Sequence, residues 1–280
     1  MAVILSLCKR NLIEFVRNKT RLVLSLIFPF FLIYIFSGIF EVAGTGEIDA
    51  TSIMLAGIVI ATVFEFALRI SSSTISDMLS GFMKEVLVSP VSRLSIALGQ
   101  FLSSAIIATL QGYVILGVSF IFGFRISSPL TLLYMTIAMI FVGFVFAGFG
   151  LFIAANTRNM QTFQIVSMAI TMPMMFLSGA YIPIQALPTV LEYIARFNPL
   201  TYTVIFFRAI SLEQLGQPTE VLLAEGLAFN IGNFTITPWI AAGILAIFGA
   251  LFLFLSTLAF TRADFSKMSR NAGDSIDEDL

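Results

Sequence analysis

The sequence predicts an all-α polytopic membrane protein with six transmembrane helices and both termini in the cytoplasm. Hydrophobic residues make up 58% of the 280 residues and charged residues only 11%, whereas soluble domains carry roughly 25% charged residues. The apolar residues form six runs, and each is long enough to cross a hydrocarbon core of ~30 Å. These predicted spans cover about residues 22–40, 53–75, 97–122, 130–153, 162–182 and 238–260.

The distribution of Lys and Arg predicts which side of the membrane each connection faces. The segments that we place inside hold eleven of these residues, and the segments outside hold only Arg125, Arg196 and Arg208. Cytoplasmic loops are enriched in Lys and Arg, so both chain ends lie inside and residues 183–237 lie outside. We expect a multi-pass protein of the cell membrane, with a six-span domain over residues 22–260 and a disordered cytoplasmic tail over residues 261–280.

The cysteine and histidine content excludes several kinds of site. The chain has one cysteine, Cys8, and no histidine. It therefore has no intramolecular disulfide, and a zinc, haem or Cys/His catalytic site is not expected. The motif G-x-x-x-x-G-K-[ST], which would cradle nucleotide phosphates, does not occur in the chain. We expect no catalytic residue, cofactor or metal, and no nucleic-acid partner.

Residues 1–21 read as an amphipathic helix on the inner surface of the membrane. A helical wheel places Ile4, Leu5, Cys8, Leu12, Phe15 and Val16 on an apolar face, opposite Lys9, Arg10, Glu14 and Arg17. The cations of such a helix meet anionic lipid headgroups. The alternative is that these residues are only the positively charged flank of the first span.

Two charged residues, Glu65 and Arg69, fall within the second span. They lie four residues apart on one helix face, so they can form an ion pair. A lone charge at the bilayer centre costs ~2.5–3.5 kcal/mol, whereas a pair near the inner end satisfies itself while Arg69 reaches the headgroups. The alternative is that the two side chains line a transport path.

A charged segment that contains a helix breaker, Asp77–Arg93, connects the second and third spans. Met78–Val88 can form about three helical turns with Lys84 and Glu85 toward water. Pro90 ends this helix because proline lacks an N–H. We interpret the short helix as a cytoplasmic binding element for a partner protein, and the alternative is a solvated connecting loop.

The segment around the end of the fifth span is rich in proline, which predicts short and broken helices. The prolines are Pro173, Pro183, Pro188 and Pro199. Helices over residues 191–196 and 201–212 would be too short to span and too apolar for water. Broken backbone at membrane depth is tolerated only where it is buried in protein or lines a cavity. We therefore interpret residues 183–237 as an outer gate or lid.

Three stretches, taken in order, resemble the ABC-2 type transporter permeases of the drug- and antibiotic-exporter kind. The first is Arg17–Phe36 with its mid-span Pro29, and the second is Lys84–Arg93 followed by Leu98-Gly99-Gln100. The third contains Leu177-Ser178-Gly179, Pro183, Leu187-Pro188, Ile194-Ala195, Asn198-Pro199-Leu200-Thr201-Tyr202 and Arg208. The resemblance covers most of the chain, although Glu65 and Arg69 are not a recognised feature of that family.

The resemblance implies a half-transporter. Two six-span subunits, either two copies of this chain or this chain and a homologue, would form the substrate path as a dimer. Separate ATP-binding ABC subunits, which hold the ATP and magnesium, would drive it. The ATPase contact would comprise Gly81, Phe82, Lys84, Glu85, Leu87, Ser89, Pro90 and Arg93. The outer gate or lid would comprise Pro173, Ser178, Gly179, Pro183, Pro188, Asn198, Pro199, Tyr202 and Arg208.

The function that we expect is that of a permease subunit of an ATP-driven exporter, with a lipophilic or amphiphilic cargo. Two alternatives stay open. One is an ion-coupled secondary transporter with Glu65 and Arg69 in the path, which needs no ATPase. The other is a membrane scaffold that transports nothing, and it explains the proline-rich outer segment poorly.

Overall fold

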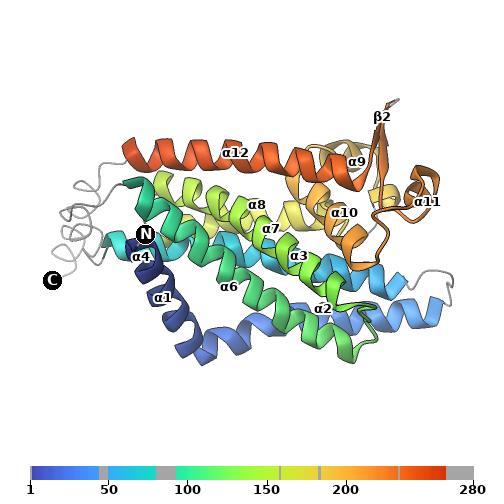
Figure 1. Ribbon diagram of the computed structural model, residues 1–280, viewed down its shortest axis with the longest axis horizontal. Coiled ribbons are helices and arrows are strands. Elements are labelled where there is room, and N and C mark those ends of the chain that lie inside the picture. The colour runs from blue at the N-terminus through green and yellow to red at the C-terminus, as the bar shows by residue number, and fades with distance from the viewer. Residues whose placement is uncertain are drawn as a thin grey trace.

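The computed structural model describes residues 2–43, 50–79, 93–157, 159–181, 184–232 and 234–262. Long helices run along one axis, and a group of short elements covers one end of them (Figure 1). In chain order the elements are α1 (Ala2–Arg17), α2 (Lys19–Ala43), α3 (Ala50–Ile70), α4 (Ser72–Leu79), α6 (Arg93–Ile121), α7 (Pro129–Asn156), α8 (Met160–Leu177), the 3₁₀ helix η1 (Ile184–Ala186), α9 (Thr189–Ala195), α10 (Pro199–Ser211), α11 (Thr219–Ala224), β1 (Phe229–Ile231), β2 (Phe234–Ile236) and α12 (Pro238–Arg262).

Within the described residues, five helices are long and apolar enough to cross a membrane, and a bent pair of helices can supply a sixth span. The five cover Thr51–Asp77, Ser95–Ile121, Pro129–Asn156, Met160–Leu177 and Pro238–Ala259. The bent pair joins Leu5–Arg17 to Leu22–Ile35 at an angle of 72°. The prediction of a mostly helical protein is therefore confirmed, with five to six helices that could span a membrane, and the exact six spans stay a prediction.

Helix α1 begins and helix α12 ends at the same end of the bundle, which we call the terminal end (Figure 1). The short helices α9, α10 and α11 lie at the opposite end with the β1–β2 hairpin, and we call this the hairpin end. The side of the membrane that each end faces stays a prediction.

Helix α3 forms the centre of the core. It contacts α6, α7 and α10, and Phe64 packs edge-on against Phe146 of α7 with ring centroids 4.6 Å apart. Its close approach to α7 depends on a glycine, because a Cβ on Gly150 would lie 2.7 Å from the carbonyl oxygen of Leu68. Small residues at such crossings let helices pack closely in lipid.

The buried face of α1 differs from the predicted apolar face. Leu7, Asn11 and Phe15 are buried, and α1 packs against α6. Leu5 and Val16, which the helical wheel placed on the apolar face, are exposed. The predicted apolar face was assigned to the membrane, so that assignment stays a prediction. The contact with α6 was not predicted, and it includes Asn11, a polar residue that has hydrogen-bond partners on α6.

The hairpin end contains two strands, so the prediction of an entirely helical chain was wrong there. β1 pairs antiparallel with β2, with Phe229 opposite Ile236 and Ile231 opposite Phe234. Apolar and polar residues alternate in each strand, and Gly232 at the turn has a positive φ of 59°, as hairpin turns often require. Strands of three residues show too little alternation to stand out beside long apolar helices.

Helix α8 is continuous across Pro173, so the prediction that this proline breaks the fifth span was also wrong. Proline removes one helix hydrogen bond, but membrane helices tolerate this loss through neighbouring groups and local adjustment. The helix ends instead at Leu177, where the N–H of Ser178 donates to the Met175 carbonyl at 3.3 Å. Gly179 follows with a φ of +83°, a conformation that favours glycine and commonly closes helices.

Replacing Gly150 by alanine should destabilise the bundle, although alanine is normally the better helix former by about 1 kcal/mol. The added Cβ would lie 2.5 Å from Ser71 Oγ and 2.7 Å from the Leu68 carbonyl oxygen, and α7 would have to shift. The melting temperature in detergent measures the effect. Gly117→Ala is the matched control, because among the described residues no atom outside its own stretch of helix lies within 4 Å of the added Cβ, and it should keep or raise the melting temperature. Equal stability of the two variants would contradict the packing.

Candidate functional site

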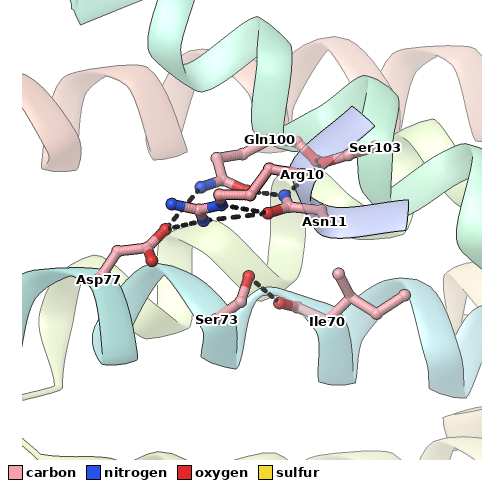
Figure 2. Close-up of polar contacts among 7 residues, drawn as sticks. All are labelled: Arg10, Asn11, Ile70, Ser73, Asp77, Gln100 and Ser103. Carbon is pink, nitrogen blue, oxygen red and sulfur yellow. Dashed lines mark hydrogen bonds and ion pairs between the residues drawn. The ribbon is translucent and has the colours of Figure 1, made fainter. Parts of the chain in front are cut away.

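Five polar side chains at the terminal end form one hydrogen-bonded cluster, which we call the Arg10 cluster (Figure 2). Arg10 Nη2 pairs with Asp77 Oδ2 at 2.5 Å and also donates to Asn11 Oδ1 at 3.0 Å. Asn11 Nδ2 donates to Gln100 Oε1 and Ser103 Oγ, each at 2.9 Å. Gln100 Nε2 donates a hydrogen bond to Asp77 Oδ2 at 3.4 Å, which closes the ring of contacts. The cluster therefore joins α1, α4 and α6.

The Arg10 cluster is well shielded from solvent. Asn11, Gln100 and Ser103 are buried, and the side chain of Asp77 is only 13% exposed. Buried polar groups are almost always hydrogen-bonded because an unmade bond is costly, and here each side chain provides a partner for the next. Along the chain, α4 precedes residues 80–92 and α6 follows them. The cluster therefore connects α1 to both helices that flank this segment.

Most of the predicted ATPase-contact residues lie outside the described residues, and their role stays a prediction. Gly81, Phe82, Lys84, Glu85, Leu87, Ser89 and Pro90 belong to this set, whereas Arg93 is the first residue of α6. Sequence reasoning did not identify Asn11, Gln100 and Ser103 as a site. The available signal was weak: polar side chains in otherwise apolar helices, where they commonly hydrogen-bond to neighbouring helices.

A groove of about 670 Å³ lies between α3 and α8, with residues of α2 and α4 at its edges. We call it the α3–α8 groove, and its volume is in the range of small-molecule pockets, ~300–1,000 Å³. Its polar lining consists of Glu65, Arg69, Ser72, Gln164, Ser167 and Thr171. Its apolar and aromatic lining consists of Phe28, Leu68, Met160, Phe163, Met168, Met172, Met175, Phe176 and Tyr181.

The α3–α8 groove has a buried floor and an exposed edge. Leu68, Phe163 and Met175 are buried, whereas Phe28 of α2 and Met168 of α8 are exposed. The exposed edge consists of large apolar side chains, so it suits contact with lipid, with a second subunit or with an apolar ligand. An apolar molecule could thus enter from the side of the bundle.

Glu65 and Arg69 form the ion pair that their spacing predicts. Arg69 also lies over the ring of Phe66, with its Cζ 5.7 Å from the ring centroid, a favourable cation–π contact. The Arg69 side chain is 51% exposed and the Glu65 side chain only 20% exposed. Both residues line the α3–α8 groove, so the pair satisfies itself and also faces a cavity.

Ser167 places an unsatisfied hydroxyl in the wall of the same groove. Its residue is 9% exposed, and among the described residues its buried Oγ has no hydrogen-bond partner. Leaving a buried hydroxyl unpaired costs about 1–3 kcal/mol. A molecule in the groove would satisfy this hydroxyl only if the side chain turned toward the groove, because its oxygen is buried in this conformation.

At the hairpin end, the predicted lid residues join three helix ends. Asn198 caps α10 by accepting from the Leu200 N–H at 3.0 Å, and its Nδ2 donates to the Met174 carbonyl of α8 at 2.7 Å. Thr201 Oγ1 donates to the Ala195 carbonyl at the end of α9 at 2.8 Å, and Tyr202 donates to the Arg196 carbonyl. Each side chain thus satisfies a carbonyl that a helix end leaves without an intrahelical partner.

Arg208 of α10 is the buried cation of this junction. Its Nε donates to the Ile53 carbonyl at 2.7 Å and its Nη2 to the Ala180 carbonyl at 3.0 Å. Among the described residues no carboxylate pairs with it. Burial lowers the pKa of Arg208 to about 10, so the guanidinium stays charged at neutral pH. Gly57 makes room for it, because a Cβ there would lie 2.8 Å from Nη2.

The remaining lid residues lie near this junction or outside the described residues. Ser178 and Gly179 close α8, Pro188 precedes α9, and Pro199 is the first residue of α10. Pro173 lies inside α8, and Pro183 is outside the described residues. The role of these residues as a gate stays a prediction.

Asn198→Ala should lower the stability of the junction by about 1–3 kcal/mol, because it removes both a helix cap and a bond to another helix. Thermal unfolding in detergent and the protease sensitivity of the hairpin end measure the loss. Asn159→Ala is the control, since Asn159 caps α8 through the Thr162 N–H and no bond from it to another helix is seen among the described residues. If the two variants lose equal stability, the bond to Met174 contributes little.

Comparison with known proteins gives one family match. The family model described as "ABC-2 type transporter" matches residues 2–212. A protein of Escherichia coli strain K12 named as a multidrug ABC transporter permease, YbhR, is 30% identical over 124 residues, which is 44% of this chain and 33% of that protein.

Two other relatives match different shares of the chain. Nodulation protein J of Rhizobium leguminosarum bv. trifolii is 32% identical over 117 residues, 42% of this chain and 44% of that protein. A transport permease of Cyanophora paradoxa, ycf38, is 25% identical over 204 residues, 71% of this chain and 70% of that protein. The chain thus spans about a third of the Escherichia coli relative and less than half of the nodulation protein.

Proposed function

Because the chain belongs to the ABC-2 type transporter family, we propose that it is the membrane-spanning permease subunit of an ATP-driven exporter. Two such subunits form the substrate path as a dimer, and separate ATP-binding subunits carry the ATP and magnesium. The chain lies in the cytoplasmic membrane with its terminal end inside. Its cargo is a lipophilic or amphiphilic compound, as the word multidrug in the name of one relative suggests.

The α3–α8 groove is the observation that carries this proposal. It offers about 670 Å³ lined by methionine and aromatic side chains, with an ion pair and hydroxyl groups in the same wall. An apolar wall with a few polar groups is the usual composition of a small-molecule site. Its exposed edge gives an amphiphile a lateral route from the bilayer, and a second subunit against that edge would enclose the path.

The Arg10 cluster supports the proposed contact with the ATPase. It binds α1 to α4 and α6, the two helices that flank residues 80–92. A partner that pushes on residues 80–92, through Lys84 and Glu85, would therefore move α1 as well. The angle of 72° between α1 and the described part of α2 turns a movement along the surface into a tilt of the first span, a type of rigid-body transition.

The proposed function is tested by coexpressing the chain with an ABC ATP-binding subunit, purifying the complex and reconstituting it in liposomes. We expect co-purification, and ATP hydrolysis that amphiphilic compounds stimulate. Glu85→Pro disrupts a helix by about 3 kcal/mol and should abolish association or stimulation without affecting membrane insertion. Transport that persists without any ATPase and follows an ion gradient would instead support the secondary transporter.

The Arg10 cluster makes a separate prediction about coupling. Asp77→Arg should leave the ATPase bound but reduce cargo-stimulated hydrolysis by about fivefold or more, the usual lower range of coupling between sites, because Arg10 then meets a like charge. The double variant Arg10→Asp with Asp77→Arg restores opposite charges and should recover much of the stimulation.

Lys9→Gln is the control for this charge exchange, because Lys9 is exposed on the same helix and its change should leave stimulation intact. An Asp77→Arg complex with unchanged stimulation would show that α1 is not part of the coupling. If Asp77→Arg lowers the stimulation and the double variant does not restore it, the loss is due to steric misfit of the new side chains and not to their charge.

A further inference from the structure

The two charged side chains of the α3–α8 groove differ in how exposed each is to solvent. Among the described residues that line the groove, Glu65 and Arg69 carry the charges. The Arg69 side chain is 51% exposed, whereas the Glu65 side chain is 20% exposed. The groove therefore contains a shielded anion whose partner is a half-exposed cation on a long side chain.

We propose that the α3–α8 groove selects a lipophilic organic cation, such as a protonated amine on an apolar body, and that Glu65 is the residue that determines this specificity. The ammonium group takes the place of the Arg69 guanidinium on Glu65. This inference rests on the proposed function, in which the groove is the cargo path, and adds the chemical class of the cargo.

The asymmetry of the pair favours a cation over an anion. When a cation displaces Arg69, the guanidinium can turn to water or headgroups on its long, flexible side chain. It also sits in the last turn of α3, where the helix dipole stabilises positive charge. When an anion takes Arg69 instead, Glu65 is left shielded and unpaired, and the loss of one partner from a shielded pair is strongly unfavourable.

The other lining groups fit the same class of ligand. Oxygen acceptors for an ammonium group line the groove, namely Glu65 and the amide of Gln164. The aromatic faces of Phe28 and Phe163 attract a cation, and the methionine thioethers fit irregular apolar bodies. An anion would find Arg69 as its main charged donor, and that group is already engaged by Glu65.

Three fluorescent probes with one apolar body test the inference: pyrenebutylamine, pyrenebutanol and pyrenebutanoate. Each is titrated at neutral pH into the permease–ATPase complex in nanodiscs, and binding to empty nanodiscs is subtracted. We expect the amine to bind about tenfold or more tighter than the alcohol, the scale of one charge-assisted contact. The carboxylate should bind no tighter than the alcohol.

Glu65→Gln should remove the preference for the amine and leave binding of the alcohol unchanged. Arg69→Gln should keep or increase the preference, because no partner must be displaced. If either single variant fails to fold, the double variant Glu65→Gln with Arg69→Gln removes both charges and should also lose the preference. Glu192→Gln is the matched control, since Glu192 pairs with Arg196 at the same spacing, at 2.6 Å, outside the groove, and this variant should retain the preference.

Several outcomes would overturn the inference. Equal binding of amine and alcohol to the unmodified complex would do so, as would an amine preference that survives Glu65→Gln. If the complex assembles and hydrolyses ATP in response to cargo but shows either result, the permease function stands and the cation specificity is wrong. If no probe binds above empty nanodiscs, the groove is not the cargo path. If the ATPase does not associate, the proposed function itself is wrong.

Discussion

The structure depends on one constraint, which is that backbone polar groups in a bilayer must find partners within the protein. Long helices meet it along their length, so the difficulty falls on helix ends. At the hairpin end α8 and α9 terminate close to the start of α10, and carbonyls at the ends of α8 and α9 accept from Asn198, Thr201 and Tyr202. Arg208 adds donors to the carbonyls of Ile53, in the first turn of α3, and Ala180, in the loop after α8. The motif that resembles other permeases is thus, in physical terms, a set of side-chain donors for backbone carbonyls, several of them at helix ends.

The ion pair in the second span shows that two interpretations of one pattern can hold together. Glu65 and Arg69 satisfy each other, as a charge within a membrane helix requires, and the same pair faces a cavity. A structural pair buried between helices would be unavailable to a ligand, and isolated charges in the groove would be unstable without one. The observed arrangement keeps the charges stable when the groove is empty and accessible when it is filled.

The long helices could be predicted from the sequence, whereas the contacts between them could not. An apolar run of about twenty residues is a strong signal, so the predicted spans agree closely with α3, α6, α7 and α12. The acceptor for Asn198 Nδ2 lies 24 residues away and is a backbone carbonyl, which leaves no pattern in the sequence. The Arg10 cluster depends on how α1 is rotated against α6, and hydrophobicity does not indicate this rotation because Asn11 is polar and is buried with hydrogen-bond partners.

The exposed edge of the α3–α8 groove includes Phe28, which belongs to α2, and α2 continues from the clamped helix α1 through a sharp bend. In the proposed transporter, a molecule that widened the groove on this side would displace α2, and the strain would then reach the Arg10 cluster. Binding equilibria of this kind are reciprocal. If the bound ATPase raises the affinity for cargo by some factor, bound cargo raises the affinity for the ATPase by the same factor. Cargo would then act as an assembly factor for its own transporter, and the occupancy of the complex would follow the supply of compound in the membrane.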